Sequence, residues 1–338
     1  MADNKKFKIL SLDGGGVRGY LSVRILENIE KHLNEKEGNK KPLGERFDLI
    51  VGTSTGAIIA GLLAICKSAK EIRKFYENDI PIIFGKQMRR KKIAGASIMF
   101  PKYKPSELQK KAESYFEGLT FEDVKIDLVV TTVDISTMTP RLYKSDFADK
   151  NKGRVDEKLS SAIIASVSAP VYFPVARNLK HSDYLIDGGV VANNPSMIGI
   201  TDALTFERNS KRGTPKPTNL GDILLLSIGT GEQTEKPYDL KPLLNTGGLD
   251  WLFQIPLGKY EKSTPLIDII MASQAKLIEF QAKTLLEVSS GAYRRINPKL
   301  SSKMKLDDVE CFGELKNISD LVADDIKWIN ENMIGENL

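Results

Sequence analysis

Two short apolar runs near the N-terminus stop abruptly at glycine-containing loops, and each loop leads directly into a helical pattern. Residues 7–12 precede the loop Asp-Gly-Gly-Gly-Val-Arg-Gly, and residues 47–51 precede Gly-Thr-Ser-Thr-Gly. A short apolar run of this kind is typical of a strand that is buried on both faces. Successive strand–loop–helix units build a mostly parallel sheet with helices on both sides. The repeated unit therefore predicts an α/β fold.

The alternation of strand and helix patterns continues well beyond these two units. Further strands are expected over residues 124–135, 184–190 and 222–228, with helical patterns between them. We therefore expect a three-layer α/β/α catalytic domain over residues 1–235, built on a mostly parallel central sheet.

Strand patterns end at about residue 235, whereas helical patterns continue through the C-terminal third of the chain. Residues 265–287 and 315–333 carry apolar side chains at helical spacing. A mainly helical C-terminal extension over residues 236–338 is therefore expected to pack on the first domain, as a cap or as a regulatory region.

Charge and cysteine content narrow the classes of protein that remain. The chain of 338 residues has 49 basic and 44 acidic side chains, and its net charge of +5 is too small to indicate binding to a nucleic acid duplex. Its two cysteines lack the spacing of a zinc site. The N-terminus has no signal-peptide pattern, and the longest apolar run, residues 57–66, is about half a membrane span. We expect a soluble, cytoplasmic protein that meets a membrane only at its surface.

The second glycine loop fits the pattern G-x-S-x-G, with Gly52 and Gly56 on either side of Ser54. It lies between an expected strand and an expected helix, the context in which this pattern forms a nucleophile elbow. A serine on such a tight turn projects its hydroxyl above the sheet, and the following helix N-terminus supplies N–H groups and a positive dipole. The simpler alternative is a serine that only caps the helix. We expect Ser54 to be a nucleophile.

A serine nucleophile needs a general base, and the two histidines are poorly placed to provide one. His32 lies about 13 residues into the first helix, roughly 20 Å from the glycine loop at about 1.5 Å per residue. His181 precedes Asp187 by six residues, about 20 Å in an extended strand. Asp187 ends an expected strand, at the edge of the sheet where α/β proteins place their sites. We therefore expect Asp187 to be the base, with a plain Asp-Gly turn as the alternative.

The first glycine loop places Gly14, Gly15 and Gly16 between a strand and a helix. Backbone N–H groups without side chains around them are able to point at a shared anion, as in an oxyanion hole. Arg18 adds a positive charge suited to holding either the loop or a phosphate headgroup. The loop also fits the G-x-G-x-x-G fingerprint of dinucleotide-binding proteins. That alternative is disfavoured because Ser54 follows the second strand, where the fingerprint expects an acidic residue.

The two glycine loops and the Asp-Gly-Gly step at Asp187, taken in this order, resemble the patatin-like phospholipase family. Shorter stretches agree with the resemblance, at residues 165–170, 172–174, 193–195 and 227–231. The resemblance implies a patatin-like fold and a catalytic dyad of Ser54 and Asp187. The first glycine loop and Arg18 would form the oxyanion region. It also implies hydrolysis of phospholipids, lysophospholipids or other lipid esters without a metal or other cofactor.

Other functions stay open from the sequence. Some bacterial patatin-like proteins are phospholipase effectors that a cyclic nucleotide activates during antiviral defence, and the C-terminal third has room for such a sensor. A lipid-binding module without turnover is a further alternative. The basic and apolar stretch of residues 80–104, which includes Tyr103, is expected to contact an anionic membrane surface, unless it is only a basic surface loop over an apolar core segment. Neither the lipid, nor an activator, nor the oligomeric state follows from the sequence.

Overall fold

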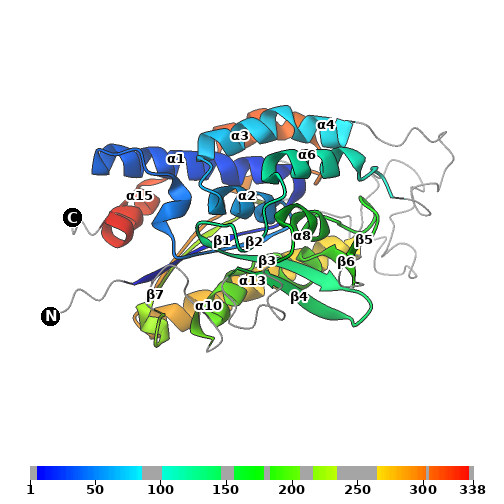
Figure 1. The fold of residues 1–338 in the computed structure, drawn as a ribbon. Helices are drawn as coiled ribbons and strands as arrows, with labels where there is room; N and C mark the ends of the chain where they lie inside the picture. The colour runs from blue at the N-terminus through cyan, green and yellow to red at the C-terminus, as the bar shows by residue number, and fades with distance from the viewer. Residues whose placement is uncertain are drawn as a thin grey trace, which may run out of the picture.

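The computed structural model describes residues 6–85, 101–145, 156–178, 183–205, 216–233, 265–301 and 304–334. Within these ranges the chain forms three layers, a central sheet with helices on both of its faces. Figure 1 shows the sheet crossing the middle of the molecule, with one group of helices above it and another below it. The three-layer α/β architecture predicted from the sequence is confirmed.

The central sheet has eight strands in the order β5-β6-β3-β2-β1-β7-β9, with β4 paired to β3. Their bounds are β1 (Phe7–Leu12), β2 (Leu49–Thr53), β3 (Asp127–Asp134), β4 (Thr139–Lys144), β5 (Ala176–Asn178), β6 (Asp183–Asp187), β7 (Ile223–Ile228) and β9 (Ala292–Ile296). Strands β3, β2, β1, β7 and β9 run parallel, whereas β4, β5 and β6 are antiparallel to their neighbours. A separate two-stranded sheet joins β8 (Glu232–Gln233) to β10 (Lys299–Leu300).

The helices divide between the two faces of the central sheet. One group consists of α1 (Gly19–Glu37), α2 (Thr55–Ala64), α3 (Ala69–Asn78), α4 (Ile80–Gly85), α6 (Ser106–Phe116), α8 (Leu159–Ser166), α14 (Phe312–Asn317) and α15 (Ala323–Ile329). The other group consists of α9 (Gly189–Ala192), α10 (Ser196–Leu204) and α13 (Pro265–Val288). Each group closes its own hydrophobic core against the sheet.

Strands β1 and β2 are buried on both faces, as their apolar sequences predict. Alternate side chains of a strand point to opposite faces of the sheet. Leu10 and Ile50 therefore join the core beneath α1 and α2, whereas Ile9, Leu49 and Val51 join the core beneath α10 and α13. Because β1 and β2 are parallel neighbours, the two glycine loops that follow them emerge side by side at one edge of the sheet.

The expectation that strands end near residue 235 was wrong, because β9 extends the parallel sheet beside β7. In this pairing Leu225 lies opposite Tyr293 and Ser227 lies opposite Arg295. The sequence of β9, Ala-Tyr-Arg-Arg-Ile, has no apolar run. An edge strand is covered on fewer sides than a central one, so it tolerates polar side chains. Such a strand therefore has no apolar run that would predict it from the sequence. The expected helix over 265–287 is present as α13.

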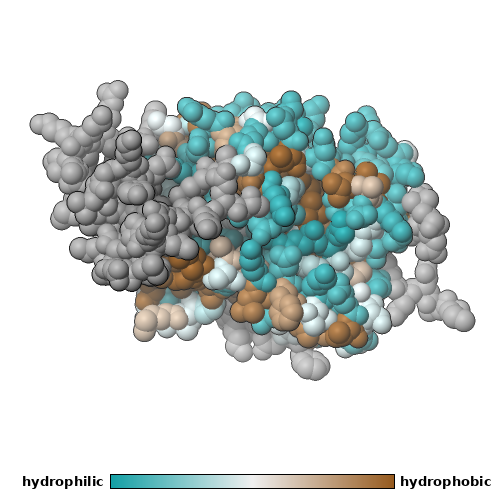
Figure 2. All heavy atoms as spheres, turned by 180° about the vertical axis from the view of Figure 1, so that it is seen from behind, coloured by the Kyte–Doolittle hydropathy of each residue, from teal (hydrophilic) through white to brown (hydrophobic). Residues whose placement is uncertain are grey.

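None of the described helices is both long and apolar enough to span a bilayer. Helix α13 nevertheless exposes apolar side chains, including Leu277, Phe280 and Val288. Figure 2 shows that apolar side chains on the back face of the molecule gather in separate areas among hydrophilic ones.

Candidate active site

Ser54 lies on a tight turn between β2 and α2, with backbone angles φ 54° and ψ −123°. A positive φ is costly for a serine, and such strain is typical of nucleophile elbows. The flanking glycines allow the turn because neighbouring backbone comes very close to them. A Cβ atom at Gly52 would lie 2.4 Å from the carbonyl oxygen of Gly56, and a Cβ at Gly56 would lie 2.2 Å from that of Leu12. The turn therefore requires glycine at both positions.

The structure brings Ser54 and Asp187 together from distant parts of the chain. The Ser54 hydroxyl donates a hydrogen bond of 2.6 Å to Oδ2 of Asp187. The other carboxylate oxygen, Oδ1, accepts a 2.7 Å hydrogen bond from the N–H of Gly189. Asp187 is the last residue of β6, which pairs with β3 so that Thr132 lies opposite Asp187. Antiparallel pairing with β3 thus carries the carboxylate to the edge of the sheet where β2 ends, immediately before Ser54.

Burial of Asp187 changes its acidity in a direction that suits a proton acceptor. The side chain is 3% exposed, and this burial raises the pKa of Asp187 to about 6, against the opposing hydrogen bonds from Ser54 and Gly189. A carboxylate with a pKa close to neutral pH binds a proton more strongly than an ordinary aspartate does. It is still largely ionised at pH 7.

The glycine loop after β1 lies directly beside Ser54. A Cβ atom at Gly14 would lie 3.3 Å from the Cβ of Ser54. The N–H of Gly14 already donates to the carbonyl oxygen of Asn193 at 2.9 Å, and the carbonyl of Gly14 accepts from the Thr230 hydroxyl at 2.9 Å. Of the three amides that were predicted to face an anion, Gly14 is therefore engaged in holding the loop.

The next two glycines face the cavity in front of Ser54. Gly15 and Gly16 both line that cavity, and their N–H groups have no acceptor among the residues that the structure describes. A Cβ at Gly15 would collide with Thr230 at 2.2 Å, and one at Gly16 would collide with the Leu306 carbonyl at 2.1 Å. The loop is thus packed too closely for side chains, and its two free donors belong to residues that line the same cavity as Ser54.

Arg18 supports the loop from one side. Its Nε donates a long hydrogen bond of 3.4 Å to the carbonyl oxygen of Gly15. Burial lowers the pKa of the Arg18 guanidinium, whereas the neighbouring carboxylate of Asp268 raises it. Of the two roles predicted for Arg18, this contact favours holding the loop.

A largely apolar cavity opens in front of Ser54 and Asp187, which both line it. Its walls come from α2, α4, α6 and α13 and from the segment after α8. The apolar lining includes Ile58, Ile80, Ile83, Phe84, Leu108, Val167, Phe173, Met271 and Leu306. An apolar lining with a few polar groups, among them Ser54 and Asp187, suits a long aliphatic group that carries a polar ester.

The position of His32 is consistent with its exclusion as the general base for Ser54. Nε2 of His32 lies 2.7 Å from Oδ1 of Asn330, on a part of α1 that packs near the C-terminal helices. His181 lies outside the described residues. The described residues also contain no group of three or more His, Cys, Asp or Glu side chains arranged to hold a metal ion.

Part of the predicted membrane-contact stretch, residues 80–104, is described. The basic cluster at 86–92 and the apolar residues 98–100 lie outside the described residues. Tyr103, which was expected to face a membrane beside them, is instead 1% exposed and donates a hydrogen bond to Asp307. That part of the expectation was wrong, because the ring packs against Phe84 and Phe173.

Sequence reasoning missed several residues that complete the site. Ser166 accepts the N–H of Ser54 at 2.9 Å, Asn193 and Thr230 hold Gly14, and Met271 and Leu306 line the cavity. Ser166, Asn193 and Thr230 fall in stretches that already supported the family resemblance. Met271 and Leu306 carry no local signal, since they are ordinary apolar residues brought in by the fold.

The fold and the site together define a class of protein. It is an α/β protein that carries a serine on a G-x-S-x-G turn, beside a buried aspartate at the carboxyl edge of the sheet. Comparison with known proteins narrows this class. The family model described as "Patatin-like phospholipase" matches residues 10–200. The chain belongs to the patatin-like phospholipase family. Membership of this family supports the assignment of the chain as a lipid hydrolase.

Two sequence relatives, at 31% and 35% identity, agree with the family assignment. Patatin-like protein 4 of Arabidopsis thaliana is 31% identical over 340 residues, which cover 94% of this chain and 83% of the relative. A cGAMP-activated phospholipase of Vibrio cholerae is 35% identical over 249 residues, covering 70% of this chain and 66% of the relative. Among solved structures, VipD from Legionella pneumophila matches with a TM-score of 0.40 at 12% identity, over 93% of this chain and 67% of that one.

Proposed function

We propose that this protein hydrolyses fatty-acyl esters of phospholipids or lysophospholipids, with Ser54 as nucleophile and Asp187 as general base. The observation that carries the proposal is the 2.6 Å hydrogen bond from the Ser54 hydroxyl to the buried carboxylate of Asp187, in the lining of an apolar cavity. No histidine is needed between the two groups, because the carboxylate itself is within reach of the proton.

The chemistry follows from this geometry in two halves. Ser54 Oγ attacks the ester carbonyl carbon while its proton moves to Oδ2 of Asp187, and the N–H groups of Gly15 and Gly16 stabilise the oxyanion. The intermediate collapses to acyl-Ser54, and Asp187 returns the proton to the oxygen of the departing alcohol. A water molecule then gives a proton to Asp187 and attacks the acyl carbon. The bond between the acyl carbon and Ser54 Oγ then breaks, Asp187 returns its proton to Oγ, and the fatty acid is released.

The cavity explains why a fatty-acyl group is the proposed substrate. Each methylene group that moves from water into an apolar site contributes about 0.8 kcal/mol to binding. A long chain in this cavity would hold its ester carbonyl near Ser54, which converts apolar binding into correct orientation of the reacting atoms.

Filling the cavity is expected to change the preferred chain length. Ile83 lines the cavity, so Ile83→Trp should lower kcat/KM for a sixteen-carbon ester at least about tenfold relative to a four-carbon ester. Paired assays with p-nitrophenyl palmitate and p-nitrophenyl butyrate measure this ratio. Ile82→Trp is the matched control, because Ile82 is 40% exposed on the same helix. An unchanged ratio in Ile83→Trp would mean that the acyl chain lies elsewhere.

The raised pKa of Asp187 predicts the pH dependence of the reaction. The base is active only when it is ionised, so kcat/KM should rise with pH through an apparent pKa of about 6 and level off above it. An ordinary aspartate would give a half-maximal rate near pH 4 instead. Initial rates from pH 4.5 to 8 with an uncharged ester measure the profile. A rate that is flat over this range would argue against a base whose pKa is raised to about 6.

The proposed function is tested by digesting a mixture of phospholipids and lysophospholipids and identifying the products by mass spectrometry. Wild-type protein should release fatty acid in the presence of EDTA, and Ser54→Ala should not. Lipid binding without release of fatty acid would identify a binding module instead.

A second candidate, hydrolysis that needs a nucleotide activator, is favoured by the 35% identity to a phospholipase named as cGAMP-activated. The same digestion is therefore run with and without cGAMP. Fatty-acid release only in the presence of cGAMP would support this candidate, and equal release in both arms would contradict it.

A further inference from the structure

The residue that precedes the glycine loop is a buried carboxylate with a buried cationic partner. Asp13 lies directly after the last residue of β1, at the start of the glycine loop, and is 3% exposed. Arg295 on β9 contacts both of its oxygens, with Nη2 to Oδ2 at 2.6 Å and Nη1 to Oδ1 at 3.3 Å. Two nearly parallel contacts of this kind fix the orientation of a carboxylate as well as its position.

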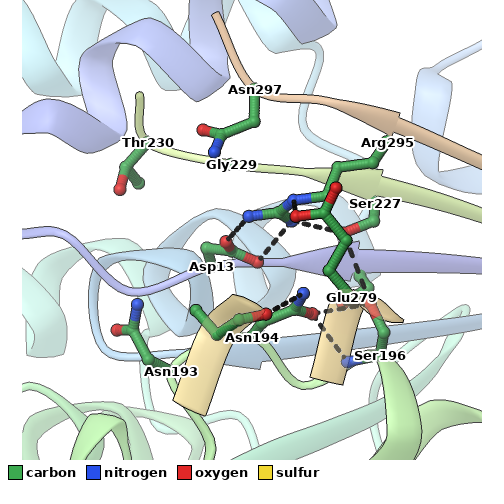
Figure 3. Close-up of polar contacts among 12 residues, drawn as sticks. Asp13, Asn193, Asn194, Ser196, Ser227, Gly229, Thr230, Glu279, Arg295 and Asn297 are labelled. Atoms are coloured by element: carbon green, nitrogen blue, oxygen red, sulfur yellow. Dashed lines mark hydrogen bonds and ion pairs between the residues drawn. The ribbon is translucent and has the colours of Figure 1, made fainter. Parts of the chain in front are cut away.

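Arg295 is itself held in place by other side chains, as Figure 3 shows. Its Nη1 donates to the hydroxyl of Ser227 on β7 at 2.7 Å. Its Nε lies 3.0 Å from a carboxylate oxygen of Glu279 on α13. The guanidinium therefore lies between the carboxylates of Asp13 and Glu279, and the Arg295 side chain is only 7% exposed.

A chain of hydrogen bonds continues from Ser227 back to the glycine loop. The Ser196 hydroxyl contacts that of Ser227 at 3.3 Å and donates to Oδ1 of Asn194 at 2.6 Å. Asn193, which precedes Asn194 in the chain, accepts the N–H of Gly14 through its carbonyl oxygen. The contacts thus form a closed circuit that starts at Asp13 and returns to Gly14.

We infer that Arg295 is a positioning residue for the oxyanion donors: through Asp13 it holds the loop so that the N–H groups of Gly15 and Gly16 face the carbonyl that Ser54 attacks. The inference rests on the proposed function. Arg295 does not touch the reacting atoms, and it lies beyond residues 10–200, which match the family model. The C-terminal third therefore completes the active site by providing β9 and α13.

Replacement of Arg295 by methionine tests this role. Hydrogen-bond donors in an oxyanion hole are effective only when they are fixed in advance, and loss of one donor typically lowers kcat about 10²- to 10³-fold. Arg295→Met should therefore lower kcat about 100-fold and change KM less than about threefold. Labelling of Ser54 by a fluorophosphonate, which forms a similar oxyanion-like adduct, should slow in parallel. Arg295→Lys should recover only part of kcat, because an ammonium group cannot make both contacts.

The matched control is Arg294→Met, on the next residue of the same strand. This substitution also removes an ion pair, the one that joins Arg294 to Asp325 at 2.7 Å. That ion pair lies away from the glycine loop. We expect its kcat to stay within about twofold of the wild-type value. An equal loss of kcat in Arg294→Met and Arg295→Met would overturn the inference.

A double variant separates positioning from folding, even if Arg295→Met alone folds poorly. Asp13→Asn combined with Arg295→Met removes the buried charge that the single variant leaves unpaired, so the thermal midpoint should recover. The kcat value should stay low, because the loop is still untethered. Recovery of kcat together with the midpoint would overturn the positioning role. Absence of hydrolysis by the wild-type protein would instead reject the proposed function.

Discussion

Ser54→Ala is expected to lower the rate of ester hydrolysis by at least about 10⁴-fold. The substitution removes the only atom that the proposed mechanism joins to the acyl group, and removal of a serine nucleophile in other hydrolases costs about 10⁶-fold. The fold should persist, because alanine loses only the 2.6 Å hydrogen bond to Asp187. Steady-state assays with a p-nitrophenyl ester measure the loss, and a thermal melt checks the fold.

Covalent labelling identifies the nucleophile independently of any substrate. A fluorophosphonate should attach to Ser54 in the wild-type protein, and peptide mapping by mass spectrometry would locate it. Ser168→Ala is a suitable control, because Ser168 is also buried in this region but donates its hydroxyl to the carbonyl of Ile164. Its labelling and its rate should stay within about threefold of wild type. Label on another serine would reject the assignment of Ser54.

Asp187→Asn is expected to lower kcat about 10³-fold while leaving the fold intact. Asparagine has nearly the same shape, and its amide oxygen is still able to accept the N–H of Gly189. It is unable to accept a proton from Ser54 at neutral pH, so the loss is that of general-base catalysis, typically 10²- to 10⁴-fold. The pH dependence near 6 should disappear from the residual activity.

The same substitution should raise stability at neutral pH, which a merely structural aspartate would not do. The folded pKa of about 6 exceeds the ordinary value of 3.8, so the folded state binds more protons than the unfolded state between these values. The free energy of unfolding therefore falls by about 3 kcal/mol as the pH rises from about 4 to about 6. Asp187→Asn removes this loss, and the thermal midpoint at pH 7 should rise by a few degrees.

Asp134→Asn is a control in which the expected change of stability has the opposite sign. Burial alone would raise the pKa of Asp134, but hydrogen bonds from Ser136 and Arg141 outweigh it and lower the pKa. This carboxylate therefore stabilises the fold at neutral pH, and its replacement should lower the thermal midpoint without reducing kcat. If Asp187→Asn behaved like Asp134→Asn, with lower stability and most of its activity kept, Asp187 would be a structural residue.

Much of the fold and of the candidate site was predictable because the signals are local. The elbow around Ser54 needs glycine at Gly52 and Gly56 for close backbone contacts, and that need is visible in the sequence. Buried parallel strands need apolar side chains on both faces, so β1, β2 and β7 appear as apolar runs. The position of Asp187 at the end of a strand was visible because the short run Tyr-Leu-Ile before it is followed by two glycines.

Other parts of the site have no local pattern to detect. Strand β9 is polar because it lies at the edge of the sheet, so its place beside β7 depends on tertiary packing. The engagement of the Gly14 amide by Asn193 also appears only when two distant loops meet. The cavity also has no local pattern, since its apolar walls come from four helices and from other segments that are distant in the sequence, and their apolar residues resemble those of any buried segment.

Residue patterns along the chain were thus sufficient for the α/β class, for the two glycine loops and for the candidate pair Ser54 and Asp187. These features depend on backbone geometry and burial, which act over a few neighbouring residues. Only the folded chain brought Arg295 to Asp13, set the distance between the hydroxyl and the carboxylate, and raised the pKa of Asp187 by burial. Those properties depend on which strands become neighbours and on how completely they exclude water, and no short segment of the sequence carries that information.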